Sequence, residues 1–282
     1  RVTYYRGLEF FNENNYEEAE QYFNISLSNN YDAAIYAQTL FWKSEIDYRR
    51  ENYKQAANGF TLFLNNSKSK EVVEYPMCFY NLAYAEFKQK KYSSATTRFK
   101  EFLSFKNQIA DYRLIADAYN RLGDCAFMQS QLESAHVYYS QAVEMNVYDV
   151  DYALFQKAQT EGSLRQYDTK NNTMKELIER YPSSSYIADA QYEIANTFFS
   201  AGKTQEALNA YDNFITQNPK NQLVKSALLK KGSIYYNNKQ DEKALEVYKQ
   251  IVANYPHTDE AGTALKSIEN IYVASGNVDD FF

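Results

Sequence analysis

Small, bulky and polar positions return in the same order along this sequence. The clearest copy runs from Tyr181 to Pro256 and alternates helix-like stretches with short polar turns. Its prolines, Pro182, Pro219 and Pro256, are separated by 37 residues at each step (219−182 and 256−219). A period of this length predicts stacked copies of one helical hairpin rather than a single globular core.

Seven copies align on one position of the second helix, which we use as the anchor. Six of the seven anchors are alanine: Ala19, Ala56, Ala95, Ala135, Lys170, Ala207 and Ala244. Four residues later each copy has a large, mostly apolar residue: Phe23, Phe60, Phe99, Tyr139, Met174, Tyr211 and Tyr248. Twelve residues before the anchor each copy has a small one: Gly7, Ser44, Ala83, Gly123, Ala158, Ala195 and Gly232. Small residues let two antiparallel helices approach closely, and we expect the bulky residue to fill the space between adjacent hairpins.

This arrangement resembles the tetratricopeptide repeat family, whose pattern contains Leu-Gly, then Ala-x3-Phe, then Pro. The glycines at the small position, the pairs of alanine and aromatic residue, and the three prolines carry the resemblance, which covers nearly the whole chain. The family's Trp and Tyr of the first helix are mostly absent, and the steps between anchors exceed the usual length of about 34 residues. The Tyr-Pro-x-Ser start at Tyr181 and the long steps are similar to bacterial cell-envelope members, of the outer-membrane-assembly lipoprotein and Tol–Pal coordinator types.

The repeat predicts an all-α solenoid, and the resemblance implies a right-handed superhelix. We expect a single solenoid over residues 1–282, with seven hairpins at about 2–28, 31–66, 72–106, 110–145, 150–180, 184–217 and 221–254, and a partial eighth at 257–282. Because the eighth copy stops a few residues into its second helix, we expect the sequence to be a piece of a longer protein. An atypical terminal cap is the alternative.

Two places depart from the pattern. The fifth copy has Lys170 at the anchor, and it has Gly162 where the other six copies have Phe11, Tyr48, Phe87, Phe127, Phe199 and Tyr236. We favour a drifted copy, in which the lysine stem packs and its ammonium group reaches water; a softer joint near 162–175 is the alternative. The longest connection, from Asn65 to Pro76, is expected to be a solvated loop.

Composition and motifs argue against several functions. The formal charge is −6, from 30 basic and 36 acidic residues, and no basic run suggests nucleic-acid binding. Cys78 and Cys125 lack metal-ligand spacing and are interpreted as packed thiols. His136 and His257 are far apart, and no metalloprotease, nucleophile-elbow or phosphate-loop motif occurs. No apolar run approaches the roughly 20 residues of a membrane span. We therefore expect no enzyme activity, cofactor, bound metal or transmembrane segment.

Binding has more support in the sequence. In the resembled family the first helices line the concave face. Fifteen residues before the anchors stand Tyr4, Phe41, Tyr80, Asn120, Phe155, Tyr192 and Leu229, and four residues further on stand Leu8, Glu45, Tyr84, Asp124, Gln159, Asn196 and Ser233. An aromatic row beside a variable polar row suits a peptide groove. Aromatic stripes on helices are more often core, and we favour core packing for the first row.

We therefore expect a non-catalytic scaffold that binds a peptide or a partner protein along the concave face. The candidate binding residues are Tyr4, Phe41, Glu45, Tyr80, Tyr84, Asn120, Asp124, Phe155, Gln159, Tyr192 and Asn196. The family's Lys/Asn clamp for a terminal carboxylate is not expected, because only Asn196 matches it. The alternative is a structural spacer or a regulatory module of a larger cell-envelope protein. The envelope likeness points to the periplasm, with the cytoplasm as the other possibility.

Overall fold

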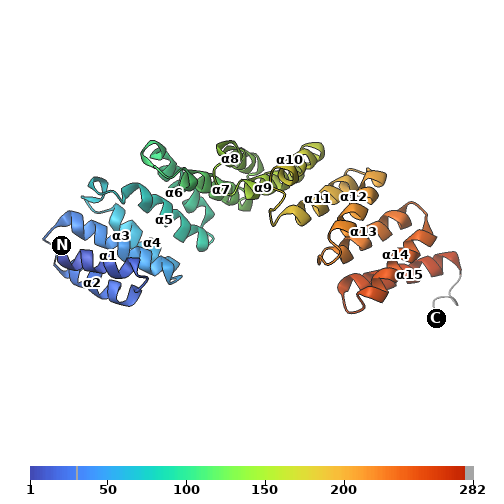
Figure 1. Cartoon of the computed structure of the whole chain (residues 1–282), viewed down its shortest axis with the longest axis horizontal. Coiled ribbons are helices and arrows are strands. Elements are labelled where there is room, and N and C mark those ends of the chain that lie inside the picture. Colours follow the sequence, from blue (N-terminus) through green and yellow to red (C-terminus); the bar gives the residue numbers. More distant parts are fainter. Residues whose placement is uncertain (30, 277–282) are drawn as a thin grey trace. The chain divides into compact units, whose positions relative to one another are not determined.

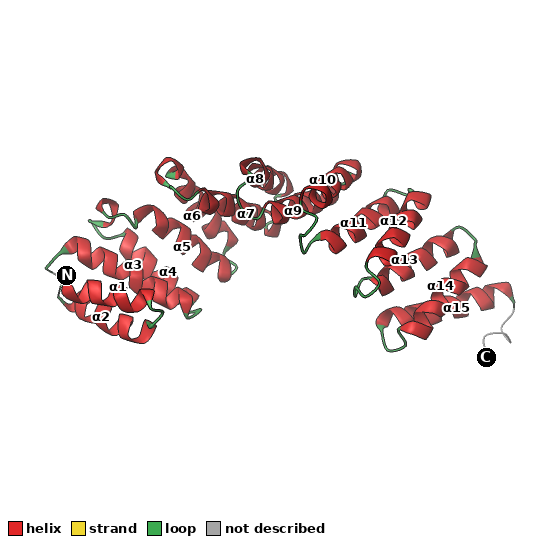
Figure 2. Cartoon of the chain, in the orientation of Figure 1, coloured by secondary structure: helices red, strands yellow, loops and turns green. Residues whose placement is uncertain are grey.

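The computed structural model describes residues 1–29 and 31–276, and within them every regular element is a helix (Figure 2). The α-helices are α1 (Val2–Asn12), α2 (Tyr16–Ser28), α3 (Ala33–Arg49), α4 (Tyr53–Leu64), α5 (Tyr75–Lys88), α6 (Tyr92–Ser104), α7 (Tyr112–Met128), α8 (Leu132–Met145), α9 (Val150–Ser163), α10 (Tyr167–Arg180), α11 (Ile187–Ser200), α12 (Thr204–Gln217), α13 (Val224–Asn237), α14 (Asp241–Asn254) and α15 (Asp259–Ser275). Two short 3₁₀ helices, η1 (Ser69–Glu71) and η2 (Lys106–Gln108), follow α4 and α6.

The chain forms two compact units, Arg1–Ala153 and Leu154–Phe282, and α9 crosses the boundary. In the first unit each helix from α1 to α8 packs against the next one in sequence (Figure 1). In the second unit the same holds from α10 to α15. Packing between successive neighbours, without one central core, is the architecture of a helical solenoid, and the all-α fold class expected from the sequence is confirmed.

One contact recurs inside the hairpins: the bulky residue of the second helix lies on the small residue of the first. A methyl group on Gly7 would place its carbon 2.5 Å from Phe23 Cε1, and one on Gly123 would lie equally close to Tyr139 Cε1. The bulky residue therefore packs within its own hairpin, and our expectation that it fills the space between hairpins was incomplete. Burying such a ring contributes about 1.5–3 kcal/mol, and a larger residue at the small position would push the helices apart.

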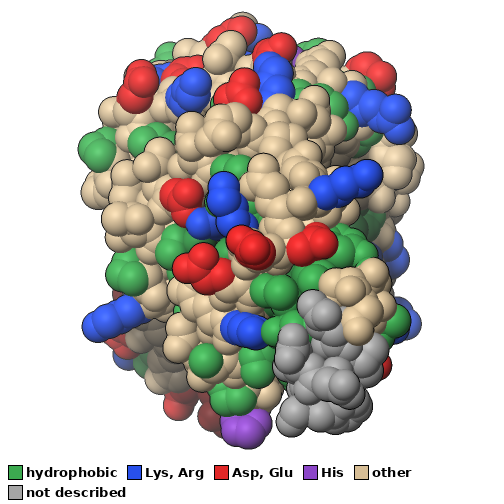
Figure 3. Space-filling view, turned by 90° about the vertical axis from the view of Figure 1, so that its right-hand side faces the viewer, with side chains coloured by type: hydrophobic (Ala, Val, Ile, Leu, Met, Phe, Trp, Pro, Cys, Tyr) green, Lys and Arg blue, Asp and Glu red, His purple; other side chains and the backbone are tan. Residues whose placement is uncertain are grey.

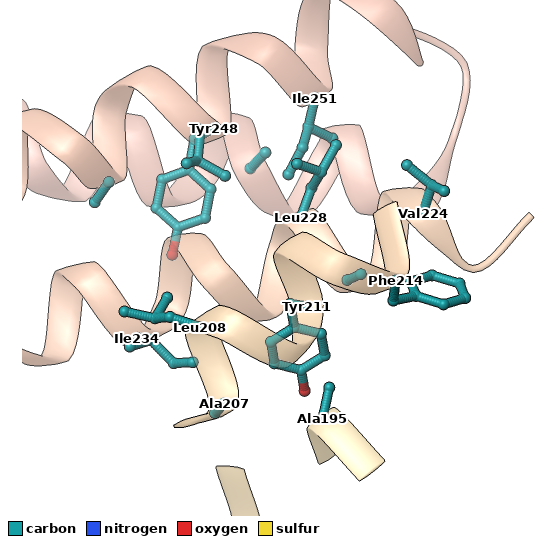
Figure 4. Packing of buried hydrophobic residues seen from close by; sticks show 14 of the residues in the cluster. Ala195, Ala207, Leu208, Tyr211, Phe214, Val224, Leu228, Ile234, Tyr248 and Ile251 are labelled. Carbon is teal, nitrogen blue, oxygen red and sulfur yellow. The ribbon is translucent and has the colours of Figure 1, made fainter. Parts of the chain in front are cut away.

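The core of the second unit shows how these contacts join into a continuous layer. Figure 4 shows Tyr211 beside Ala195 of the preceding helix, with Leu208 to its left and Tyr248 higher up. Ala195, Tyr211 and Tyr248 are each at most 2% exposed. Because the buried side chains of α12 also pack on α13, each hairpin is stabilised by its neighbour as well as by its own two helices.

The connection between α4 and α5 is only in part the solvated loop expected from the sequence: Lys70, Glu71 and Val73 are exposed, but other residues are buried. Ser69 is fully buried, and the carboxylate of Glu74 is buried as well. Glu74 accepts hydrogen bonds from Gln38 Nε2 at 3.1 Å and from Trp42 Nε1 at 3.2 Å, both on α3. These partners satisfy a carboxylate that would otherwise be costly to bury, and they tie the connection to the preceding hairpin.

Every hairpin turn contains one residue in the left-handed conformation, five positions before the anchor. The set is Asn14, Glu51, Lys90, Ser130, Arg165, Gly202 and Lys239, with φ between 56° and 71°. Only one of the seven is glycine, although a residue with a Cβ loses about 1–2 kcal/mol in this conformation. The sequence pattern gave no indication of this position, because the turn geometry is imposed by the packing of the two helices.

This geometry predicts that Lys90→Gly stabilises the protein by about 1 kcal/mol, because Lys90 has φ of +60° and is exposed. Thermal unfolding followed by circular dichroism measures the effect. Lys90→Ala is the matched control: it removes the same side chain but keeps the Cβ, and it should change stability by only a few tenths of a kcal/mol. Equal stability of the two variants would contradict the prediction.

Candidate recognition surface

The first helices of successive hairpins in the first unit bring tyrosines and charged residues onto one surface. Its members come from α3, α5, α7 with its N-cap, the segment before α9 and the first turn of α9. We call them the tyrosine–carboxylate surface: Glu45, Tyr48, Arg49, Tyr80, Asn81, Tyr84, Asp111, Arg113, Asp117, Arg121, Asp124, Tyr148 and Tyr152. Glu45, Tyr80, Tyr84 and Asp124 are among the residues predicted from the sequence. The other members were not predicted.

Asp117 connects two of the predicted tyrosines. The hydroxyl of Tyr80 donates to Asp117 Oδ2 at 2.7 Å, and the hydroxyl of Tyr84 donates to the same oxygen. The two rings also contact each other, with centroids 5.0 Å apart. Burial, reinforced by the Asp117 charge, raises the pKa of both tyrosines well above the usual value. The two phenols therefore stay protonated and act as fixed donors to one carboxylate.

Asp124 forms a second centre two turns further along α7. Its Oδ1 accepts from the hydroxyls of Tyr139 at 2.7 Å and Tyr152 at 2.6 Å. Arg121 joins the two centres, with Nη1 2.5 Å from Asp124 Oδ2 and Nε 3.5 Å from Asp117 Oδ1. Burial opposes the charged guanidinium, but Asp124 and other neighbouring groups raise the pKa of Arg121 above its ordinary value. Two carboxylates thus share one partly buried cation.

Glu45 extends the surface onto α3. It pairs with Arg49 Nε at 2.8 Å and accepts from Asn81 Nδ2 at 2.9 Å. Glu45 is 8% exposed, and this burial raises its pKa, although Arg49 opposes the shift. The hydrogen bond between α3 and α5 fixes the carboxylate at the edge of a hollow.

Two adjoining hollows open on this surface and share Tyr80 and Tyr84 as their common wall. One, of about 370 Å³, is also lined by Glu45, Tyr48, Arg49 and Asn81. The other, of about 310 Å³, is also lined by Asp111, Arg113, Leu114, Asp117 and Tyr148. Each is at the lower end of the size range of ligand pockets, which fits individual side chains of a bound segment better than a large cofactor.

Several other predicted residues lie in the core. Tyr4 and Phe41 are at most 4% exposed and Asn120 is fully buried, so the core-packing interpretation fits these three. Phe155 is half-buried and stacks on Tyr186 with centroids 5.0 Å apart. Tyr192 packs on Phe214 at 5.4 Å. None of the five lines the two hollows described above.

The remaining predicted residues, Gln159 and Asn196, line a polar hollow of about 280 Å³ in the second unit. Beside them the ammonium group of Lys170 lies 2.5 Å from Glu193 Oε2, and Lys170 is 7% exposed. Our expectation that this ammonium group reaches water was wrong. A methyl group on Gly162 would lie 2.9 Å from Lys170 Cδ, so the lysine stem occupies space that an aromatic side chain would otherwise take.

Features of catalytic or metal-binding proteins are few in the part of the chain that the structure describes. Among those residues no group of three or more His, Cys, Asp or Glu could hold a metal ion. Cys78 and Cys125 are buried free thiols, as expected, and burial raises the pKa of Cys125 to about 12.

No described helix is long and apolar enough to cross a membrane. On the face seen in Figure 3, acidic, basic and apolar side chains are interspersed.

Comparisons with known proteins identify the fold. Residues 148–271, less than half of the chain, match the model of the YfiO family, described as outer membrane lipoprotein. The C-terminal part of a TPR repeat-containing protein from Cytophaga hutchinsonii is 17% identical, with a TM-score of 0.72 over 93% of this chain and 99% of that one. A tetratricopeptide repeat protein from Parabacteroides merdae is 16% identical, with a TM-score of 0.58 over 94% and 98%.

A third solved structure is YrrB, described as a TPR protein with an unusual peptide-binding site. It is 19% identical, with a TM-score of 0.56 over 73% of this chain and 96% of that one. No curated protein matches the sequence. The resemblance to tetratricopeptide-repeat proteins, with relatives of the cell-envelope type, is therefore confirmed.

The fifth repeat provides a test of the packing described here. We expect Lys170→Ala to lower the free energy of unfolding by about 1–3 kcal/mol, because it leaves Glu193 without its cation and opens a void beside Gly162. Urea unfolding of the full chain measures the change. Lys203→Ala is the control, since it removes a lysine from an exposed pair with Asp168 and should change the free energy of unfolding far less than Lys170→Ala does.

The double variant Gly162→Phe with Lys170→Ala restores the residue types of the other repeats. We expect it to recover part of the stability that Lys170→Ala loses, so that the two changes are not additive. Additive effects would show that the lysine and the glycine are independent.

Proposed function

We propose that this chain is a non-catalytic protein-interaction scaffold that binds an extended peptide or a partner protein on the tyrosine–carboxylate surface. The observation that carries the proposal is the pair of adjoining hollows with a shared wall of Tyr80 and Tyr84. Both tyrosines are held by Asp117, so their rings are oriented before a partner arrives. Rigid aromatic residues next to fixed polar groups favour binding, because little side-chain freedom is lost.

The comparisons support this proposal in a general way. The fold is shared with a protein described as having a peptide-binding site, and solenoids of helical hairpins expose extended surfaces that suit partner proteins. The match of residues 148–271 to an outer membrane lipoprotein family supports a place in the cell envelope. Under this proposal the first-helix surface of the first unit is the recognition site.

Amide hydrogen exchange with a selected peptide tests the location of the site. Peptides that bind the full chain are first selected from a random display library. We expect the tightest of them to slow exchange over residues 45–49, 80–84 and 111–121, because these segments line the two hollows. Protection confined to the second unit, or a selection that yields no binding peptide, would contradict the proposal and favour a spacer role.

A variant of the same surface provides a second readout. Tyr84→Ala should weaken the selected peptide by about tenfold, the usual loss when an aromatic anchor is truncated. Tyr31→Ala is the matched control, because Tyr31 is 97% exposed and lies outside the surface. Circular dichroism establishes that both variants fold before affinities are compared. Equal affinities of the two variants would place the site elsewhere.

A further inference from the structure

The charges around the two hollows do not balance. The surface contains four carboxylates, those of Glu45, Asp111, Asp117 and Asp124, and three guanidinium groups, those of Arg49, Arg113 and Arg121. The formal charge of these groups is therefore −1 (three minus four). Asp149 and Asp151, which follow Tyr148 in the sequence, add two more carboxylates beside the surface. Burial is the main reason why the pKa of Asp149 is raised; the charges of Asp117 and Asp151 add to the shift and Arg121 opposes it.

All three cations are already engaged by carboxylates of the same surface. Arg49 pairs with Glu45 at 2.8 Å, and Arg113 binds both oxygens of Asp111, at 2.9 Å through Nε and 2.7 Å through Nη2. Arg121 lies between Asp117 and Asp124. An anionic ligand would therefore compete with these carboxylates for each guanidinium group. A cationic ligand would instead be attracted by the net negative charge of the surface.

The tyrosines also favour a cation. Tyr80 and Tyr84 donate their hydroxyl protons to Asp117, so the lone pairs of their oxygens remain as acceptors. Tyr148 lines the same hollow and is 40% exposed. The faces of such rings attract ammonium and guanidinium groups, and the attraction is strongest where water is partly excluded. Acceptor oxygens, aromatic faces and excess negative charge thus coincide at one place.

We infer that the tyrosine–carboxylate surface binds a segment of a partner protein through its lysine or arginine side chains, one in each hollow. The inference rests on the function proposed above and adds the chemistry of the partner. The hollow with Glu45 and the hollow with Asp117 each offer a carboxylate beside an aromatic wall. A positively charged segment complements this surface in charge, and the separation of the hollows by Tyr80 and Tyr84 requires two basic residues on the same segment.

Fluorescence anisotropy of the full chain with three labelled peptides tests the inference. The peptides are eight residues long, blocked at both ends, and alternate alanine with arginine, with citrulline or with glutamate. Citrulline keeps the shape of arginine and removes its charge. We expect the arginine peptide to bind at least about tenfold more tightly than the citrulline peptide, and its affinity to fall as salt is raised. Equal binding of arginine and citrulline peptides would overturn the inference.

Two matched variants locate the effect. Asp117→Asn removes one negative charge and keeps one acceptor oxygen for the two tyrosine hydroxyls, and it should weaken the arginine peptide by about five- to tenfold. Asp168→Asn makes the same change at an exposed carboxylate of the second unit, paired with Lys203, and should alter the affinity less than about twofold. Equal losses in the two variants would show a non-specific attraction to the acidic chain and would overturn the inference.

Two further outcomes separate this inference from the proposed function. If a neutral or acidic peptide binds best and still slows exchange at residues 45–49, 80–84 and 111–121, the recognition surface stands and the inferred chemistry is wrong. If no peptide slows exchange there, the proposed function fails as well. The last competitor is free spermidine, added at the same concentration of positive charge as the arginine peptide. If spermidine displaces the peptide, the surface is a site for small cations, and the inference of a partner-protein segment is wrong.

Discussion

The packing of a bulky side chain on a small residue sixteen positions earlier sets the geometry of the described hairpins. Where the small residue is glycine, as at Gly7 or Gly123, the ring of the second helix touches the backbone of the first. This contact fixes the distance between the two helices. It also fixes which side of the first helix faces its partner, and therefore which side is left for the next hairpin or for a ligand. The tyrosine–carboxylate surface depends on that orientation.

The same constraint explains why hydrogen bonds between first helices recur at nearly one repeat length. Tyr80 bonds to Asp117, 37 positions away, and Asn81 bonds to Glu45, 36 positions away. In the second unit, Ser226 bonds to Glu260, 34 positions away. Equivalent positions of adjacent copies lie side by side, so a polar residue on one first helix finds its partner on the next. The surface that we propose for recognition uses the same positions as the contacts that hold neighbouring copies together.

The period, the small and bulky positions and the helical class could be predicted from the sequence, because they follow from residue size and spacing alone. The members of the surface could be predicted only in part. Asp117 was missed, since neither of the aligned rows contains it; its place 37 residues after Tyr80 was the available signal. The ammonium group of Lys170 was assigned to water, because its burial depends on Glu193 of the next hairpin, which no local pattern reveals. The left-handed turn residues were missed because six of the seven are not glycine.

The abundance of tyrosine illustrates why composition alone does not reveal a binding site. Tyr139 is 1% exposed and Tyr31 is 97% exposed, and the 28 tyrosines of the sequence therefore serve very different purposes. What distinguishes Tyr80 and Tyr84 is a partner for the hydroxyl at the edge of a hollow. A phenol bound to a carboxylate keeps its ring in one orientation, and it places that carboxylate where water is partly excluded and electrostatic attraction is stronger. The same hydrogen bonds that satisfy a buried aspartate thus prepare the surface for a positively charged side chain.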